Sequence, residues 1–132
     1  MIPPPTEILR RIMDGSLLSS DVLRTLDHDA ILDARDGDAE FETEWLQCYN
    51  NLEAIWPIAN VTKEIVVLCE EIRRESFLAV SRATIQHEIA SYVSDDFDII
   101  IRGAILGLEK DFLNRLWSAY DRNEIPTPTF GR

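Results

Sequence analysis

The 132-residue sequence is poor in residues that form cross-links and metal sites, with only two cysteines and two histidines. Cys48 and Cys69 form no Cys-x-x-Cys motif and have no second pair, so we expect two buried free thiols and no disulfide. Free thiols are typical of a reducing compartment, and residues 1–5 lack the charged and apolar stretches of a secretory signal. No apolar run approaches the roughly 20 residues that cross a bilayer. We therefore expect a cytoplasmic protein without membrane contact.

Motifs for catalysis, cofactor binding and metal binding are also missing. His87 is followed four residues later by Ser91, where a helical zinc-protease motif requires a second histidine. Gly37 lies in an acidic run, as the glycine of a calcium-binding loop would, but three of the ligand positions around it lack the required oxygen ligand. The sequence contains neither a phosphate-binding loop nor the nucleophile elbow of a serine hydrolase. We predict no enzymatic activity, no cofactor and no bound metal.

A basic stripe for nucleic-acid binding is absent as well. The chain has 13 lysines and arginines against 24 aspartates and glutamates, and its formal net charge is −11. The doublets Arg10-Arg11 and Arg73-Arg74 are isolated among acidic neighbours. Nucleic-acid binding depends on basic groups that replace the counterions of the phosphates. We therefore expect no direct contact with nucleic acid.

Glycine and proline are scarce in the middle of the chain, where hydrophobic residues recur at helical spacing. Asp36-Gly37-Asp38 interrupts this pattern, since glycine can take the positive φ that ends a helix and Asp38 can cap the next one. We predict an all-α, single-domain bundle of five or six helices with a long central helix, spanning residues 1–132. The helices are expected over residues 6–14, 20–34 with a new turn able to start at 27–29, 38–56, 62–94 and from 97 onward, between a Pro-rich lead-in at 1–5 and a Pro-containing tail at 125–132.

The last predicted helix contains Gly103 and Gly107, one turn apart on a face that is apolar nearly all round. This spacing predicts that another helix approaches closely there. Trp45 and Tyr49 share a stripe with hydrophobic residues, so we expect them in the core, although exposure of Trp45, Tyr49 or Phe130 would instead offer an aromatic anchor for a partner.

The most informative feature is an acidic run with a single positive charge, Arg35. Eight carboxylates against this one arginine give the run about −7 of the net charge of −11. Such a field favours a basic protein partner, whereas the competing interpretation is a solvated face that only keeps the protein soluble. The run comprises Asp27, Asp29, Asp33, Asp36, Asp38, Glu40, Glu42 and Glu44, of which we select Asp29, Asp33, Asp36, Asp38, Glu40 and Glu44 as candidate partner-binding residues.

Together these features favour a protein-binding inhibitor of the immunity or antitoxin type, which would cover a basic partner such as a toxin with its acidic surface. The first alternative is a helical adaptor or oligomeric structural protein, for example a homodimer formed through the face of Gly103 and Gly107. A second alternative is an enzyme or small-ligand binder with a pocket between helices.

Overall fold

The computed structural model describes residues 2–108 and 110–129, and these residues form helices and turns without any strand. The predicted all-α class and the long helix are confirmed, with seven α-helices in the described residues where five or six were expected. In chain order the elements are α1 (Pro5–Asp14), α2 (Ser20–Leu23), α3 (His28–Asp36), α4 (Ala39–Ile55), the 3-10 turn η1 (Trp56–Ile58), α5 (Lys63–Thr84), α6 (His87–Ile105) and α7 (Asp111–Asp121).

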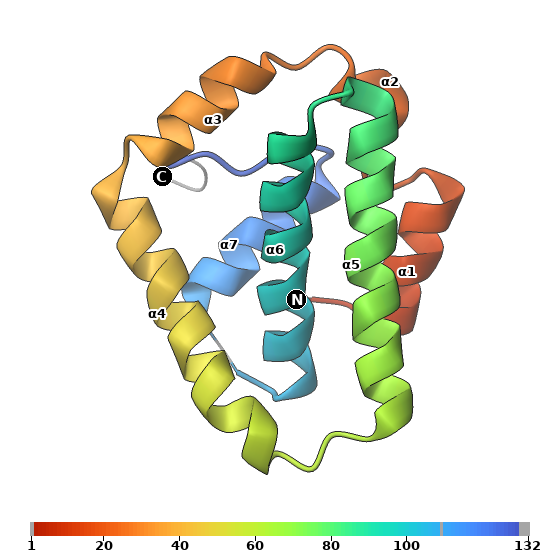
Figure 1. Ribbon diagram of the computed structural model, residues 1–132, viewed down its shortest axis with the longest axis vertical. Helices are drawn as coiled ribbons and strands as arrows, with labels where there is room; N and C mark the ends of the chain where they lie inside the picture. Colours follow the sequence, from red (N-terminus) through yellow and green to blue (C-terminus); the bar gives the residue numbers. More distant parts are fainter. Residues whose placement is uncertain (1, 109, 130–132) are drawn as a thin grey trace.

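The two longest helices, α5 and α6, form an antiparallel pair with the most extensive contact in the molecule (Figure 1). The short helices α1 and α2 pack against α5, and α7 crosses behind α6. Helices α3 and α4 form the opposite edge, where α4 contacts both α6 and α7. The acidic run therefore lies on one edge of the bundle, away from α1.

Three helices start where side-chain caps predict. Asp27 accepts a hydrogen bond from the backbone N–H of Ala30 at the start of α3, and Asp38 does the same for Phe41 at the start of α4. Thr62 caps α5 by accepting from the N–H of Ile65. Each side chain satisfies an amide that has no partner within its own helix, so these starting points are set locally.

Two local predictions were wrong in detail. Helix α1 begins at Pro5, inside the expected lead-in and before Thr6, because proline fits the first turn of a helix. Gly37 separates α3 from α4 as expected, but its φ of −87° shows that this break does not use the left-handed conformation.

The end of the predicted helix over residues 62–94 was also wrong, because the chain turns between α5 and α6. Ile85 adopts a left-handed φ of 56°, and the Gln86 side chain accepts a hydrogen bond from the N–H of Glu88 at 3.0 Å. Asp95 and Asp96, which were expected to precede the last helix, lie inside α6. Neither glycine nor proline marks this turn, so the hydrophobic pattern continues through it.

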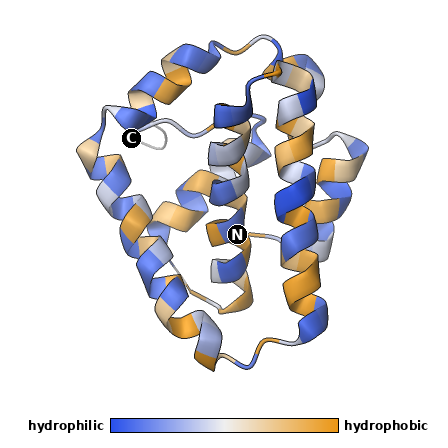
Figure 2. Ribbon diagram, in the orientation of Figure 1, coloured by the Kyte–Doolittle hydropathy of each residue, from blue (hydrophilic) through white to orange (hydrophobic). Residues whose placement is uncertain are grey.

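One hydrophobic core joins the helices, and each helix shows hydrophobic and hydrophilic segments along its length (Figure 2). At Gly103 in α6, an added Cβ would lie 2.5 Å from Cδ1 of Leu113 in α7. The predicted close helix approach is therefore realised within the chain, and α7 covers the Gly103 side of α6. Gly107 instead has a φ of 69° in the turn that follows α6.

The last described residues pack against the body of the protein, since Ile125, Pro126 and Pro128 are buried. Phe130, whose exposure was of interest, lies outside the described residues. Cys48 and Cys69 are free and buried, as expected. Among the described residues, no helix has both the length and the apolar character needed to cross a membrane.

Candidate protein-binding surface

The only arginine of the acidic run, Arg35, points into the protein. Its guanidinium makes two hydrogen bonds of 2.8 Å to the carboxylate of Asp96, which comes from α6 and is completely buried. Asp96 also accepts from the indole N–H of Trp45 at 2.9 Å and from the hydroxyl of Tyr120 at 2.5 Å. The positive charge of Arg35 thus compensates a carboxylate outside the run and does not cancel a charge of the run itself.

The charge states of the residues in this buried cluster are fixed by their neighbours. Burial of Arg35 opposes its charged form, but the adjacent Asp96 carboxylate outweighs that effect, and the pKa of Arg35 is raised. Burial, followed by the negative charge of Asp96, raises the pKa of Tyr120 well above its usual value. Arg35 therefore stays charged and Tyr120 neutral, and the cluster joins α3, α4, α6 and α7 as a structural element.

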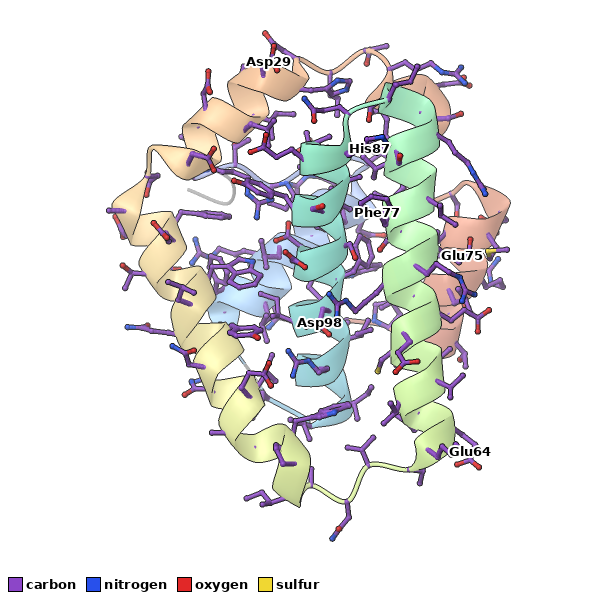
Figure 3. All side chains as sticks on the ribbon, viewed as in Figure 1. Asp29, Glu64, Glu75, Phe77, His87 and Asp98 are labelled. Carbon is purple, nitrogen blue, oxygen red and sulfur yellow. The ribbon has the colours of Figure 1, made fainter. Side chains whose placement is uncertain are left out.

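The candidate residues on α3 have two different environments. Asp29 and Asp33 are exposed, one helical turn apart, and Figure 3 shows Asp29 pointing away from the body of the molecule. Asp36 is also exposed, but it accepts a hydrogen bond from the hydroxyl of Tyr92 on α6. This bond raises the pKa of Tyr92 to about 12, because ionisation of the phenol would lose the bond and place a second negative charge beside Asp36. The outward field of α3 thus comes from Asp29, Asp33 and Asp36, of which Asp36 also binds α6.

The candidate residues near α4 differ as well. Asp38 is the α4 cap, Glu40 is exposed on the first turn, and Glu44 is partly buried. Glu44 accepts a hydrogen bond of 2.8 Å from Arg115 of α7, which neutralises its charge locally. The structure therefore separates the six selected carboxylates: Asp29, Asp33 and Glu40 face outward, while Asp36, Asp38 and Glu44 also hold elements of the fold together.

A second face of α4 lines a groove that the sequence did not reveal. Four of its residues follow one another at steps of four, three and four, which places them on one side of the helix. They line two hollows of about 270 and 470 Å³, which share Trp45, Leu46 and Asp95 and so form one groove between α4 and the α5–α6 pair. The α4 side consists of Glu42, Leu46, Tyr49 and Glu53, beside Trp45, and Trp56 of η1 continues it.

The opposite wall of this groove comes from α5 and α6. Residues 92, 95, 98 and 102 of α6 recur at helical spacing and face α4, and Figure 3 labels Asp98 among them. Sequence analysis missed this wall because it placed residues 92 and 102 in different helices. The signal that could have revealed it was the recurrence of polar residues at helical spacing, namely Tyr92, Asp95, Asp98 and Arg102. The groove residues of this wall are Tyr92, Asp95, Asp98 and Arg102 of α6 with Val66, Cys69, Glu70 and Arg73 of α5.

The groove is acidic despite its arginines. Its lining also includes Arg35 and Asp36 of α3 and Phe41 of α4, so it contains six carboxylates and three guanidinium groups in all, a formal excess of three negative charges. Arg102 is held by Asp98 at 2.7 Å and Glu53 at 3.5 Å, and Arg73 lies 3.5 Å from Asp95. A hydrogen bond from Tyr49 lowers the pKa of Glu53, so this carboxylate stays charged in the groove.

Trp45 and Tyr49, expected in the core, are half-buried at the border between the core and this groove. Their rings stack with centroids 5.6 Å apart and an interplanar angle of 18°. The side chains thus contribute to the core and also present aromatic surface to solvent. Among residues 2–108 and 110–129, no group of three or more histidine, cysteine, aspartate or glutamate side chains is placed to hold a metal ion.

The acidic edge and the groove give the fold a surface suited to a protein partner. A comparison with curated proteins found no match. A family model described as Immunity protein PIM1 matches residues 7–127, which is nearly the whole chain and includes every helix that lines the groove. The chain therefore belongs to the Immunity protein PIM1 family, and it is a protein-binding inhibitor of the immunity type.

Proposed function

We propose that this immunity protein neutralises a basic protein toxin, and that the outward carboxylates of α3 and α4 guide the encounter. The family match supports an inhibitor with a toxin as its partner. The burial of Arg35 against Asp96 is the observation that supports an acidic binding surface, because it leaves Asp29 and Asp33 without a nearby compensating charge from the run. Glu40 continues this surface onto α4.

The mechanism is occlusion rather than chemistry. Carboxylates of the inhibitor bind the arginine and lysine groups with which a toxin would hold an anionic substrate such as nucleic acid. Opposite charges accelerate the encounter over distances near the Debye length, about 8 to 10 Å at ordinary salt concentrations. In this proposal the chain has no catalytic activity and needs no cofactor, and its net charge of −11 keeps it from binding nucleic acid directly. Its buried free thiols fit a reducing compartment such as the cytoplasm.

The proposal is tested with the toxin that co-purifies with this chain from its native host. Co-expression should restore growth of a host that the toxin alone arrests, and the purified pair should form a stable complex. Failure of both would contradict an inhibitor of that toxin.

The charged surface is tested by a matched pair of double variants. Asp29→Asn/Asp33→Asn removes two charges from the proposed surface, whereas Asp21→Asn/Glu64→Gln removes two exposed charges from α2 and α5. We expect the association rate to fall severalfold in the first variant and to change little in the second. Equal rates in the two variants would contradict the assignment to α3.

A further inference from the structure

We propose that the groove between α4 and the α5–α6 pair is the anchor site for an arginine on an extended segment of the protein partner. This inference rests on the proposed function and adds to it, because the outward carboxylates guide the encounter while the groove holds the partner. Three observations support it, namely the charge of the groove, its aromatic walls and an exposed leucine within it.

The charge of the groove selects the kind of occupant. Its lining has three more carboxylates than guanidinium groups, and two of its three arginines, Arg35 and Arg102, are buried in pairs with carboxylates of α6. An anionic ligand would therefore be repelled. A second copy of this chain carries a net charge of −11 and would be disfavoured in the same way. A cationic segment of a foreign protein is complementary.

The aromatic side chains favour arginine over lysine. A guanidinium is planar and weakly hydrated, so it stacks on aromatic rings more readily than an ammonium group does. The chain itself already uses this interaction in the groove. Arg35 lies 4.9 Å and 5.2 Å from the ring centroids of Phe41 and Tyr92.

Arg102 repeats the arrangement in the larger hollow of the groove, the one of about 470 Å³. Its guanidinium lies 5.8 Å from the ring centroid of Tyr49 and 5.6 Å from that of Trp56. Between the two arginines, the stacked rings of Trp45 and Tyr49 provide further aromatic surface. An incoming arginine would thus meet the same combination of ring and carboxylate that holds Arg102.

One further observation distinguishes the groove from an ordinary acidic surface. Leu46 lines both hollows and is 43% exposed, so it offers apolar contact to the methylene stem of an arginine.

The first test uses three short peptides that differ in one side chain: acetyl-Gly-Arg-Gly-amide and its counterparts with glutamine or glutamate in place of arginine. The chain has three tryptophans, and the test follows their indole N–H signals by NMR. Trp45 and Trp56 line the groove, whereas Trp117 is buried on α7 and serves as an internal control. At millimolar peptide we expect the arginine peptide alone to shift the signals of Trp45 and Trp56. Absence of these shifts, or equal shifts with all three peptides, would overturn the inference.

The second test uses the full chain and the toxin, with two variants that exchange an exposed hydrophobic residue for lysine. Leu46→Lys places a positive charge in the groove, and Met13→Lys places the same charge on α1, beyond α5 (Figure 1). We expect at least a tenfold faster dissociation for Leu46→Lys and an unchanged rate for Met13→Lys. If the toxin binds and both variants dissociate like the wild type, the groove assignment is wrong while the inhibitor function stands. If no toxin binds, the proposed function fails, and the peptide titration still decides whether the groove takes arginine.

Discussion

The buried Arg35–Asp96 cluster and the open groove around Arg102 use the same chemistry for different purposes. Each combines an arginine, a carboxylate from α6 and aromatic rings. In the first, Asp96 accepts four hydrogen bonds and is excluded from water. In the second, the lining faces a hollow and Arg102 Nε has no partner among the described residues. Where the arrangement is closed to water, it holds four helices together. Where it is open to a hollow, it is suited to bind an additional arginine.

The largest expected effect is on stability and distinguishes two adjacent aspartates. Asp96→Ala leaves Arg35 buried without its counter-ion, which should lower the free energy of unfolding by about 3–5 kcal/mol. Asp95→Ala removes an exposed carboxylate that pairs with Arg73 at 3.5 Å, so it should change stability by less than about 1 kcal/mol. Urea unfolding of both variants measures the difference. Similar values would show that the cluster is not the structural centre described here.

A smaller effect is expected when a single hydroxyl is removed from each region. Tyr120→Phe deletes a buried bond to the Asp96 carboxylate and should cost about 1.5–3 kcal/mol. Tyr92→Phe deletes the bond to exposed Asp36 and should cost less than about 1 kcal/mol. Thermal and urea unfolding would reveal the order of the two variants, and the reverse order would contradict the comparison.

The tyrosines of both regions allow a prediction of how stability responds to alkaline pH. The pKa values of all three tyrosines are raised, Tyr49 by its hydrogen bond to Glu53, Tyr92 to about 12 by Asp36, and Tyr120 by burial. A raised pKa in the folded state favours the neutral phenol, so this stabilisation is complete below the unfolded pKa of about 10 and declines as the pH rises toward the folded value. Ultraviolet titration should show tyrosine ionisation displaced upward in the folded protein and near pH 10 in denaturant. Superimposed titrations would contradict the hydrogen bonds described for these hydroxyls.

The smallest effect should come from the groove itself. Leu46 is 43% exposed and lies outside the hydrophobic core, so Leu46→Lys should change the free energy of unfolding by no more than about 0.5 kcal/mol. A large loss of stability measured by urea unfolding would mean that Leu46 belongs to the core and not to an open groove. Together with the binding tests, this variant separates recognition from folding.

Local features were predictable from the sequence, because each depends on neighbouring residues. The caps Asp27, Asp38 and Thr62 act on amides three residues away, and the helical spacing of hydrophobic residues identified an all-α bundle. The turn at Ile85 was not predictable, since a left-handed φ is uncommon for isoleucine, the side chain is 84% exposed, and no glycine or proline marks the position.

The candidate site was predictable only in part. The concentration of charge in the acidic run was evident, but the inward turn of Arg35 depends on Asp96, 61 residues away in the chain. The groove likewise needs α4, α5 and α6 side by side, so neither of its walls was identified as part of a site from the sequence. Contacts between distant segments decide which carboxylates support the fold and which remain available to a partner.

The most direct test of the central claim, that the acidic surface of α3 and α4 recognises a basic toxin, is the salt dependence of association between the wild-type chain and that toxin. We predict that the association rate falls steeply as ionic strength increases, because screening weakens the attraction between opposite charges. An association rate that does not change with salt would contradict the claim.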